Sequence, residues 1–421
     1  MGCKSNQFEG SIIVENLVKN EFEQVQKLDE ADIYILNSCS VTHKSDNEAL
    51  YLLRNAKNKK QELFTVLTGC LAQIEKDELL KHDFIDCVVG NDEKLKMSEI
   101  LFNAQSGMCS ASDIMELSVF NKTVLEDMSK TRASLKIQDG CDNRCSYCII
   151  PFARGKSRSA DIDFIVEQIN NFVAHGFKEV VFTGIHIGQW GKDFGMELLD
   201  LLKAVEERTN VARYRLGSLN PLEINDEMLD FLSKSEKFCP HFHLSLQSAC
   251  NKTLRSMNRF YNVEDYLLQI EKINTIFDLP FLGSDVIAGF AGESVEDFET
   301  TLDNLKKSGL TQIHTFPYSI RKGTVGAGRP EQLEDKEKER RAGLIKKISA
   351  NKYSEFIAKN IGTVREVLIE KKLDKNDGML KGVTRNYLTV HLDSNDLQLI
   401  NTIKFVKITH VQNGKIYGKI V

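Results

Sequence analysis

Residues 138–148 are Gln138-Asp139-Gly140-Cys141-Asp142-Asn143-Arg144-Cys145-Ser146-Tyr147-Cys148, and the three cysteines of this stretch decide the fold. Three residues separate Cys141 from Cys145, and two separate Cys145 from Cys148. Three thiolates at this spacing can hold three irons of an iron–sulfur cube and leave the fourth iron open to a reacting molecule. A zinc knuckle is the alternative, but structural zinc usually has four protein ligands, and no second cysteine pair follows at a suitable distance. The spacing therefore favours a cluster.

Length and composition are those of a globular protein with two to four domains, since the chain has 421 residues. Hydrophobic residues make up 42% and charged residues 27%, and the net charge of −5 gives no general attraction to nucleic acid. The charge is uneven, because residues 353–421 carry eleven Lys and Arg against seven Asp and Glu. A basic end on an acidic body indicates a bound polyanion or, more simply, a solvated lysine-rich surface.

The sequence has ten cysteines but no signal peptide and no apolar run near the length of a membrane span. We therefore expect a cytoplasmic protein with no membrane partner. Thiols stay reduced in the cytosol, so clustered cysteines there indicate metal binding or catalysis and not disulfides.

The first third of the chain alternates buried-strand runs at 32–36, 64–67 and 84–89 with helical patterns such as 43–58. This alternation predicts an open parallel α/β sheet. Ligands collect at the carboxyl ends of the strands in such sheets, and Cys39 and Cys70 each stand just past such an end. Cys3 occupies a similar loop, but the strand that would precede it is missing.

A second α/β series starts at residue 133 and predicts an open, partial (β/α)6 barrel with its chemistry at the carboxyl ends of the strands. The predicted strands are 133–138, 178–183, 212–216, 241–247, 282–288 and 312–318, with helices at 161–173, 197–208, 223–235, 263–277 and 295–307. From residue 363 the hydrophobic period changes to two, which predicts a small all-β barrel. The predicted domains are 1–110, 130–352 and 353–421, with a polar linker over 105–132.

Together, these parts resemble the radical S-adenosylmethionine (SAM) methylthiotransferases, which have a cysteine-bearing α/β domain, a radical SAM barrel and a C-terminal TRAM-like RNA-binding β-barrel. The resemblance covers nearly the whole chain. Its motifs are Gly2-Cys3-Lys4-Ser5-Asn6-Gln7-Phe8-Glu9, Asn37-Ser38-Cys39-Ser40-Val41-Thr42, Thr68-Gly69-Cys70-Leu71-Ala72-Gln73, the Cys141 motif continued to Ser159, Ser245-Leu246-Gln247-Ser248, Asp285-Val286-Ile287-Ala288-Gly289-Phe290 and Phe316-Pro317-Tyr318-Ser319.

The first of these motifs, which begins at Gly2, resembles the first motif of one branch of this family. That branch acts on the threonylcarbamoyladenosine beside the tRNA anticodon. The branch acting on isopentenyl-adenosine usually opens with Gly-Cys-Gln-Met-Asn, and the branch acting on a ribosomal-protein Asp with Gly-Cys-Pro-Lys-Asn. The resemblance therefore implies methylthiolation at C2 of N6-threonylcarbamoyladenosine. The alternatives are the other two substrates or, in a different class, a non-catalytic RNA-binding protein with a structural metal.

The resemblance also implies the cofactors, SAM and two 4Fe–4S clusters. The adenine C2–H bond is too strong and too weakly acidic for a side-chain base, so a cofactor must supply a radical. Cys141, Cys145 and Cys148 are expected to hold the cluster that binds SAM. A second set, formed by Cys3, Cys39 and Cys70, is expected to hold the cluster that carries the inserted sulfur.

Further residues are expected to contact SAM or RNA. The candidates for SAM are Tyr147, Arg154, Thr183, Gly184, Ser218 and Gln247. Tyr147 could instead pack over the cluster, and Arg154 could contact RNA phosphate or lie on a solvated surface. The small barrel offers Lys371, Lys372, Arg385 and Tyr387 for phosphate contact and base stacking.

The expected partners are the anticodon stem-loop of tRNA, a low-potential electron donor protein and a sulfur donor, with the enzyme itself a monomer. The family has a strand before the Gly-Cys motif, whereas here Met1 directly precedes Gly2. We therefore expect the native start to lie upstream, so that this sequence is short by about five to nine residues.

Overall fold

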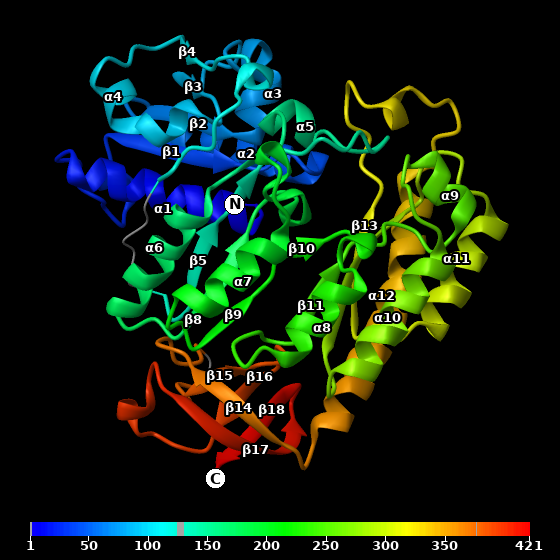
Figure 1. Ribbon diagram of the computed structural model, residues 1–421. Helices are drawn as coiled ribbons and strands as arrows, with labels where there is room; N and C mark the ends of the chain where they lie inside the picture. Colours follow the sequence, from blue (N-terminus) through cyan, green and yellow to red (C-terminus); the bar gives the residue numbers. More distant parts are fainter. Residues whose placement is uncertain (1, 124–129, 376) are drawn as a thin grey trace.

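The computed structural model describes residues 2–123, 130–375 and 377–421. Three parts follow one another along the chain: an N-terminal sheet, a middle section and a C-terminal barrel (Figure 1). The N-terminal sheet lies at one end, the parallel strands of the middle section occupy the centre, and the C-terminal barrel closes the other end. No helix within these described ranges combines the length and apolarity needed to cross a membrane.

The N-terminal sheet is parallel, with strand order β1-β2-β3-β4, and confirms the predicted α/β layer. Its strands are β1 (Ile33–Ser38), β2 (Phe64–Gly69), β3 (Cys87–Val89) and β4 (Met108–Ser110). Its helices are α1 (Lys4–Lys19), α2 (His43–Lys59), α3 (Cys70–Leu79) and α4 (Met97–Phe102). The predicted linker over 105–132 is wrong in its first part, because β4 adds to the sheet there, and its residues 124–129 lie outside the described ranges.

Strand β1 is an edge of this sheet, and its outer side pairs with no strand in the part of the chain that the structure describes. A cavity of about 470 Å³ runs along this edge, between α1 and the segment 22–28. Ile33, Tyr34 and Ile35 of β1 line it. The additional upstream strand stays a prediction.

In the described residues, the barrel of the middle section has six strands, one of which is divided into two segments. This arrangement confirms the open, partial (β/α)6 barrel. The strands are β5 (Ala133–Lys136), β8 (Glu179–Thr183), β9 (Arg213–Arg215) with β10 (Ser218–Leu219), β11 (His241–Leu244), β12 (Phe281–Ala288) and β13 (Gln312–Pro317). All pairs between them are parallel. The predicted strand 212–216 is interrupted, and the predicted strand 241–247 ends at Leu244, before Gln247 adopts a positive φ of 69°.

Helices cover the outside of this barrel. They are α6 (Ile162–Ala174), α7 (Leu198–Arg208), α8 (Asp226–Lys234), α9 (Asn251–Ser256), α10 (Val263–Ile276) and α11 (Val295–Lys307). Side chains cap the starts of α6, α8, α10 and α11. At α11, for example, the Ser294 side chain accepts a hydrogen bond from the Asp297 N–H at 3.1 Å. Side chains alternate along each strand, so Leu282 and Val286 of β12 join the core while Asp285 and Ile287 line a cavity described below.

The C-terminal β-barrel is closed and confirms the expected all-β module. Its strands are β14 (Val364–Ile369), β15 (Lys381–Thr384), β16 (Thr389–Leu392), β17 (Ile403–Gln412) and β18 (Lys415–Ile420), in the order β14-β15-β16-β18-β17. The long helix α12 (Asp335–Asn360) leads into it (Figure 1). Asn413 and Gly414 have φ of 50° and 74°, which suits the tight hairpin between β17 and β18.

A buried ion-pair group fixes this barrel to the middle section. Glu179 of β8 pairs with Arg213 at 2.6 Å and with Arg215 at 2.8 Å. Arg215 donates in turn to the carbonyls of Arg385 and Thr384, both at 2.6 Å. Burial by itself raises the pKa of Glu179, but the surrounding arginines outweigh it and lower the pKa to about 2. The carboxylate thus holds two cations that bind the C-terminal barrel through its backbone.

We expect the stabilising contribution of Glu179 to depend on pH. Its folded pKa lies below the ordinary 4.5, so the contribution is complete above pH 4.5 and is lost as the pH falls toward 2. The pH-dependent part is on the order of 3 kcal/mol. Urea unfolding of metal-free wild type and Glu179→Gln from pH 6 to pH 3 should show the stability gap narrowing in acid. A gap that stays constant would contradict this assignment.

Candidate active site

The three-cysteine motif forms the loop between β6 (Gln138–Asp139) and α5 (Ile150–Arg154), just past the carboxyl end of β5. Strand β6 pairs antiparallel with β7 (Arg158–Ser159), so the loop leaves and re-enters one two-stranded ribbon. Gly140 permits this path, because it has φ of 72° and a Cβ there would lie 1.9 Å from the Lys156 carbonyl oxygen. The ribbon therefore holds Cys141, Cys145 and Cys148 together at the mouth of the barrel.

Neighbouring groups face the sulfur atoms of this motif. The Cys141 Sγ lies 3.6 Å from His186 Nδ1, and Arg259 donates to the Cys145 Sγ at 3.3 Å. Burial, followed by the charge of the Cys145 and Cys141 thiols, raises the pKa of the Cys148 thiol to about 12. Three thiols that oppose one another's ionisation gain stability when a cation binds them, because the metal removes their protons and their repulsion.

The second set of cysteines comes from three loops of the N-terminal sheet. Cys3 caps the start of α1, Cys39 follows β1, and Cys70 begins α3 directly after β2. The register pairs Ser38 with Gly69, so Cys39 and Cys70 leave the sheet side by side. Burial raises the pKa of Cys39, and the thiols of Cys70 and Cys3 raise it further. The structure thus brings together the three cysteines that the sequence grouped.

Each set consists of cysteine thiols alone, and thiolates are the ligands that iron–sulfur clusters use. In residues 2–123, 130–375 and 377–421, no three His, Cys, Asp or Glu side chains converge on the position of a single metal ion. The fit of a cluster therefore rests on the donor type and on the grouping of the thiols.

One cavity of about 350 Å³ connects the two sets, because Cys3 and Cys148 both line it. Tyr147, Gln247 and Asp285 also line its wall. A molecule in this cavity therefore lies between Cys148 of one set and Cys3 of the other. Such an arrangement can pass a reactive group from one set to a substrate held against the other.

The remaining SAM candidates lie at strand ends around the barrel mouth. Thr183 ends β8, with its hydroxyl 3.5 Å from that of Ser5, and Gly184 follows it. The Ser218 hydroxyl lies 3.0 Å from that of Ser245. Tyr147 and Gln247 line the connecting cavity, whereas Thr183, Gly184 and Ser218 do not. Contact of all these residues with SAM stays a prediction.

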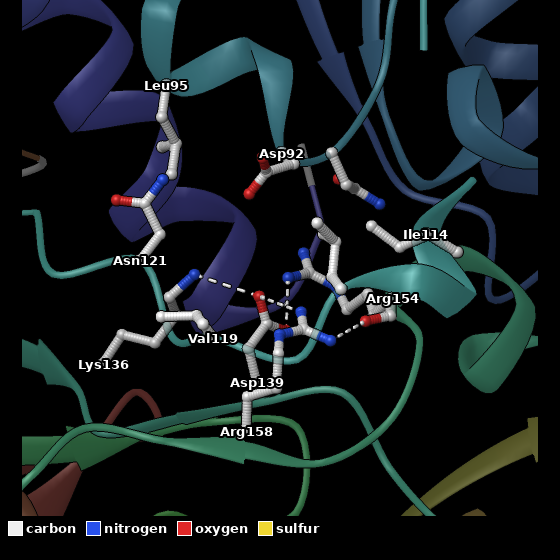
Figure 2. A pocket seen from close by; sticks show the side chains of 11 residues that line it. Asp92, Leu95, Ile114, Val119, Asn121, Lys136, Asp139, Arg154 and Arg158 are labelled. Carbon is white, nitrogen blue, oxygen red and sulfur yellow. Dashed lines mark hydrogen bonds and ion pairs between the residues drawn. The ribbon is translucent and has the colours of Figure 1, made fainter. Parts of the chain in front are cut away.

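Arg154 is 1% exposed, so the alternative of a solvated position is wrong for this residue. Figure 2 shows its side chain among those of Asp139, Arg158 and Lys136. Its guanidinium pairs with Asp139 at 3.0 Å and with both carboxylate oxygens of Glu9, at 2.7 and 2.9 Å. These partners compete with the predicted contact to SAM or RNA phosphate, which stays a prediction.

Glu9 is the centre of this buried network. It lies on α1 and is 1% exposed, and it also accepts hydrogen bonds from Lys94 at 2.6 Å and Lys136 at 2.9 Å. Burial by itself raises the pKa of Glu9, but Arg154, Lys136 and Lys94 outweigh it and hold the pKa well below its usual range. The carboxylate stays ionised and joins the helix after Cys3 to the segment after Cys148.

Asn91 extends the network to the second set of cysteines. Its amide accepts from Lys94 at 2.7 Å and donates to the Ala153 carbonyl at 2.7 Å. The same amide nitrogen lies 3.8 Å from the Cys70 Sγ and donates toward it. One set of polar contacts therefore fixes the position of Cys70 relative to the segment that follows Cys148.

Sequence reasoning missed Asn91, His186 and Arg259. Asn91 and His186 each lie two or three residues past a strand end, at Val89 and Thr183, so the rule that located Cys39 and Cys70 could have found them. Arg259 follows α9 and reaches the Cys145 sulfur over more than a hundred residues of sequence. No local pattern marks it.

Matches to family models agree with this site. Residues 1–90 match the family described as Uncharacterized protein family UPF0004, and residues 135–305 match the Radical SAM superfamily. The solved methyltransferase TsrM from Kitasatospora setae shares the fold, with a TM-score of 0.56 at 13% identity over 76% of this chain and 74% of that one. The fold and the three-cysteine motif thus define a radical SAM enzyme.

Curated relatives show which family of radical SAM enzymes the chain belongs to. The threonylcarbamoyladenosine tRNA methylthiotransferase MtaB of Aquifex aeolicus is 34% identical, over 93% of this chain and 94% of its own length. The MtaB of Rickettsia prowazekii is 35% identical over 93% and 90%. A tRNA-2-methylthio-N(6)-dimethylallyladenosine synthase of Acetivibrio thermocellus is 30% identical over 100% and 89%. The chain belongs to the radical SAM methylthiotransferase family and is of the MtaB type.

The enzyme therefore uses SAM and two 4Fe–4S clusters, as members of this family do. The alternative of a non-catalytic metal-containing protein is wrong. The two groups of three thiols match the number and the donor type of the clusters.

Proposed function

We propose that the enzyme methylthiolates C2 of N6-threonylcarbamoyladenosine beside the anticodon of tRNA. The observation that carries this proposal is the cavity that Cys3 of one set and Cys148 of the other both line. The MtaB relatives, which are 32–35% identical, support the substrate. Relatives named for dimethylallyladenosine are 30–32% identical, so that base is the second candidate.

The chain's residues take separate roles in this proposal. Cys141, Cys145 and Cys148 would hold the cluster that binds SAM, and Cys3, Cys39 and Cys70 the cluster that carries the sulfur. Bound there, the cofactors supply the radical that removes hydrogen from C2, together with the sulfur and the methyl group. The protein holds the reacting groups in a fixed geometry, which is its main contribution to such chemistry.

Two side chains that contact the cysteines, each held by a neighbour, support this geometry. The Arg259 guanidinium donates to the Cys145 sulfur and stacks on the Tyr261 ring, 4.9 Å from its centre. His186 lies against Cys141 and bonds Glu223 with its other ring nitrogen. Groups that orient a ligand in this way tune the cluster that the ligand holds.

The proposed partners are the tRNA anticodon stem-loop, a low-potential electron donor protein and a sulfur donor. We further propose that the protein works as a monomer in the cytoplasm. Its proposed domains are 1–110, 130–352 and 353–421, with Thr183, Gly184, Ser218, Gln247 and Tyr147 around bound SAM.

A reconstitution experiment tests the substrate. The full-length protein, loaded with iron and sulfide, is incubated without oxygen with SAM, dithionite and one of two anticodon stem-loops. One stem-loop carries threonylcarbamoyladenosine and the other dimethylallyladenosine. Mass spectrometry of the nucleosides should show a 2-methylthio product from the first. Product from the second alone would overturn the substrate assignment, and product from neither would overturn the proposed function.

A further inference from the structure

A basic cavity of about 250 Å³ lies where the N-terminal part, the barrel and the C-terminal module meet. Four cationic side chains line it: Lys4, Lys130, Arg132 and Lys372. The acidic lining residue is Glu370, which pairs with Arg132 at 3.2 Å. The cavity therefore carries an excess of positive charge and favours an anionic group.

Lys4 is the cation closest in sequence to the reaction centre, because it directly follows Cys3. In the described residues, neither Lys4 nor Lys372 forms a hydrogen bond or an ion pair with a carboxylate. The Lys4 ammonium lies 6.0 Å from the centre of the Tyr387 ring. Two cations of this cavity thus remain available to an anionic ligand.

Tyr387 has a backbone conformation that side chains seldom adopt, with φ of 69°. Its N–H donates to the Thr384 carbonyl at 3.1 Å, and its ring lies 4.2 Å from that of His241, measured between centroids. The Arg215 guanidinium lies 5.2 Å from the centre of the Tyr387 ring. Such backbone strain of a non-glycine residue persists where the surrounding structure enforces it, and often marks a functional site.

We propose that this cavity binds the carboxylate of the N6-threonylcarbamoyl group, with Lys4 as its principal charged partner. The inference rests on the proposed function and names the group that the enzyme reads. The threonylcarbamoyl group ends in a carboxylate, whereas a dimethylallyl group is neutral and apolar. The cavity is smaller than the ~300–1,000 Å³ typical of a site for a whole ligand, and so suits one substituent of a base. The six-membered ring of adenine contains C2 and also carries the N6 substituent, and Lys4 directly follows Cys3, which would hold the sulfur-carrying cluster.

Binding measurements separate this role from general attraction to RNA. Fluorescence anisotropy compares the cluster-loaded full-length protein on two stem-loops, one with threonylcarbamoyladenosine and one with unmodified adenosine. Lys4→Gln should weaken binding of the modified stem-loop about tenfold and leave the unmodified one unchanged. Lys19→Gln, which removes an exposed charge at the far end of the same helix, should change neither. Lys372→Gln is the second variant. It is chosen because Lys372 lies far in sequence from every cysteine of the two sets.

Equal weakening on both stem-loops would overturn the proposal, because Lys4 would then hold a backbone phosphate. Unchanged binding by Lys4→Gln and Lys372→Gln would overturn it as well. Failure of the proposed function is a different result, since wild-type enzyme would then form no 2-methylthio product from the modified stem-loop.

Discussion

Replacing Cys39 by alanine is expected to stop methylthio transfer while leaving reductive cleavage of SAM intact, whereas replacing Cys148 stops both. Cys39 belongs to the set that would carry the sulfur, and Cys148 to the set that would bind SAM. Each set has only three thiols, so loss of one leaves a cluster with two protein ligands. We expect each variant to retain about half of the wild-type iron.

Three readouts check this separation on anaerobically reconstituted protein. They are iron per chain, 5′-deoxyadenosine formed from SAM, and 2-methylthio nucleoside formed in the stem-loop. Cys109→Ser is the matched control, because Cys109 is exposed on β4 and belongs to neither set. Undiminished transfer by Cys39→Ala, or cleavage of SAM by Cys148→Ala at the wild-type rate, would contradict the assignment of the two sets.

Replacing Glu9 by alanine is expected to destabilise the fold by about 3–5 kcal/mol, because it leaves buried cations without their counter-charge. Arg154, Lys94 and Lys136 all donate to this carboxylate. The variant should also separate the two cysteine sets functionally, since the network joins α1 to α5. We expect methylthio transfer to fall further than cleavage of SAM, which needs one set alone.

Glu78→Gln is the matched control for Glu9, because Glu78 forms an exposed ion pair with Lys81 at 2.7 Å. Such pairs contribute about 0–1 kcal/mol. Urea unfolding followed by circular dichroism compares both variants with wild type. A Glu9→Ala protein as stable as Glu78→Gln would show that the buried network does not hold these parts together.

Sequence patterns predicted those features that are local. The spacing of Cys141, Cys145 and Cys148 identified one set, and strand-end positions identified Cys39 and Cys70. The alternation of strands and helices predicted the partial barrel, and the change to a hydrophobic period of two predicted the C-terminal module.

Features that depend on distant pairing were not predictable in this way. Arg154 meets Glu9 across 145 residues of sequence, so a pattern suggesting contact with SAM or RNA could not reveal that partner. The cavity around Lys4 needs residues from the N-terminal part, the middle section and the C-terminal barrel. Strand ends were also overestimated, because the pattern over 241–247 does not reveal that the strand breaks after Leu244 and that Gln247, with its positive φ, meets β12 through an isolated bridge to Val286.

Nucleoside mass spectrometry of total tRNA, from cells with and without this gene, tests the central claim most directly. If the enzyme methylthiolates threonylcarbamoyladenosine, its 2-methylthio form disappears without the gene and the unthiolated precursor accumulates. An unchanged level of 2-methylthio-threonylcarbamoyladenosine would contradict the account.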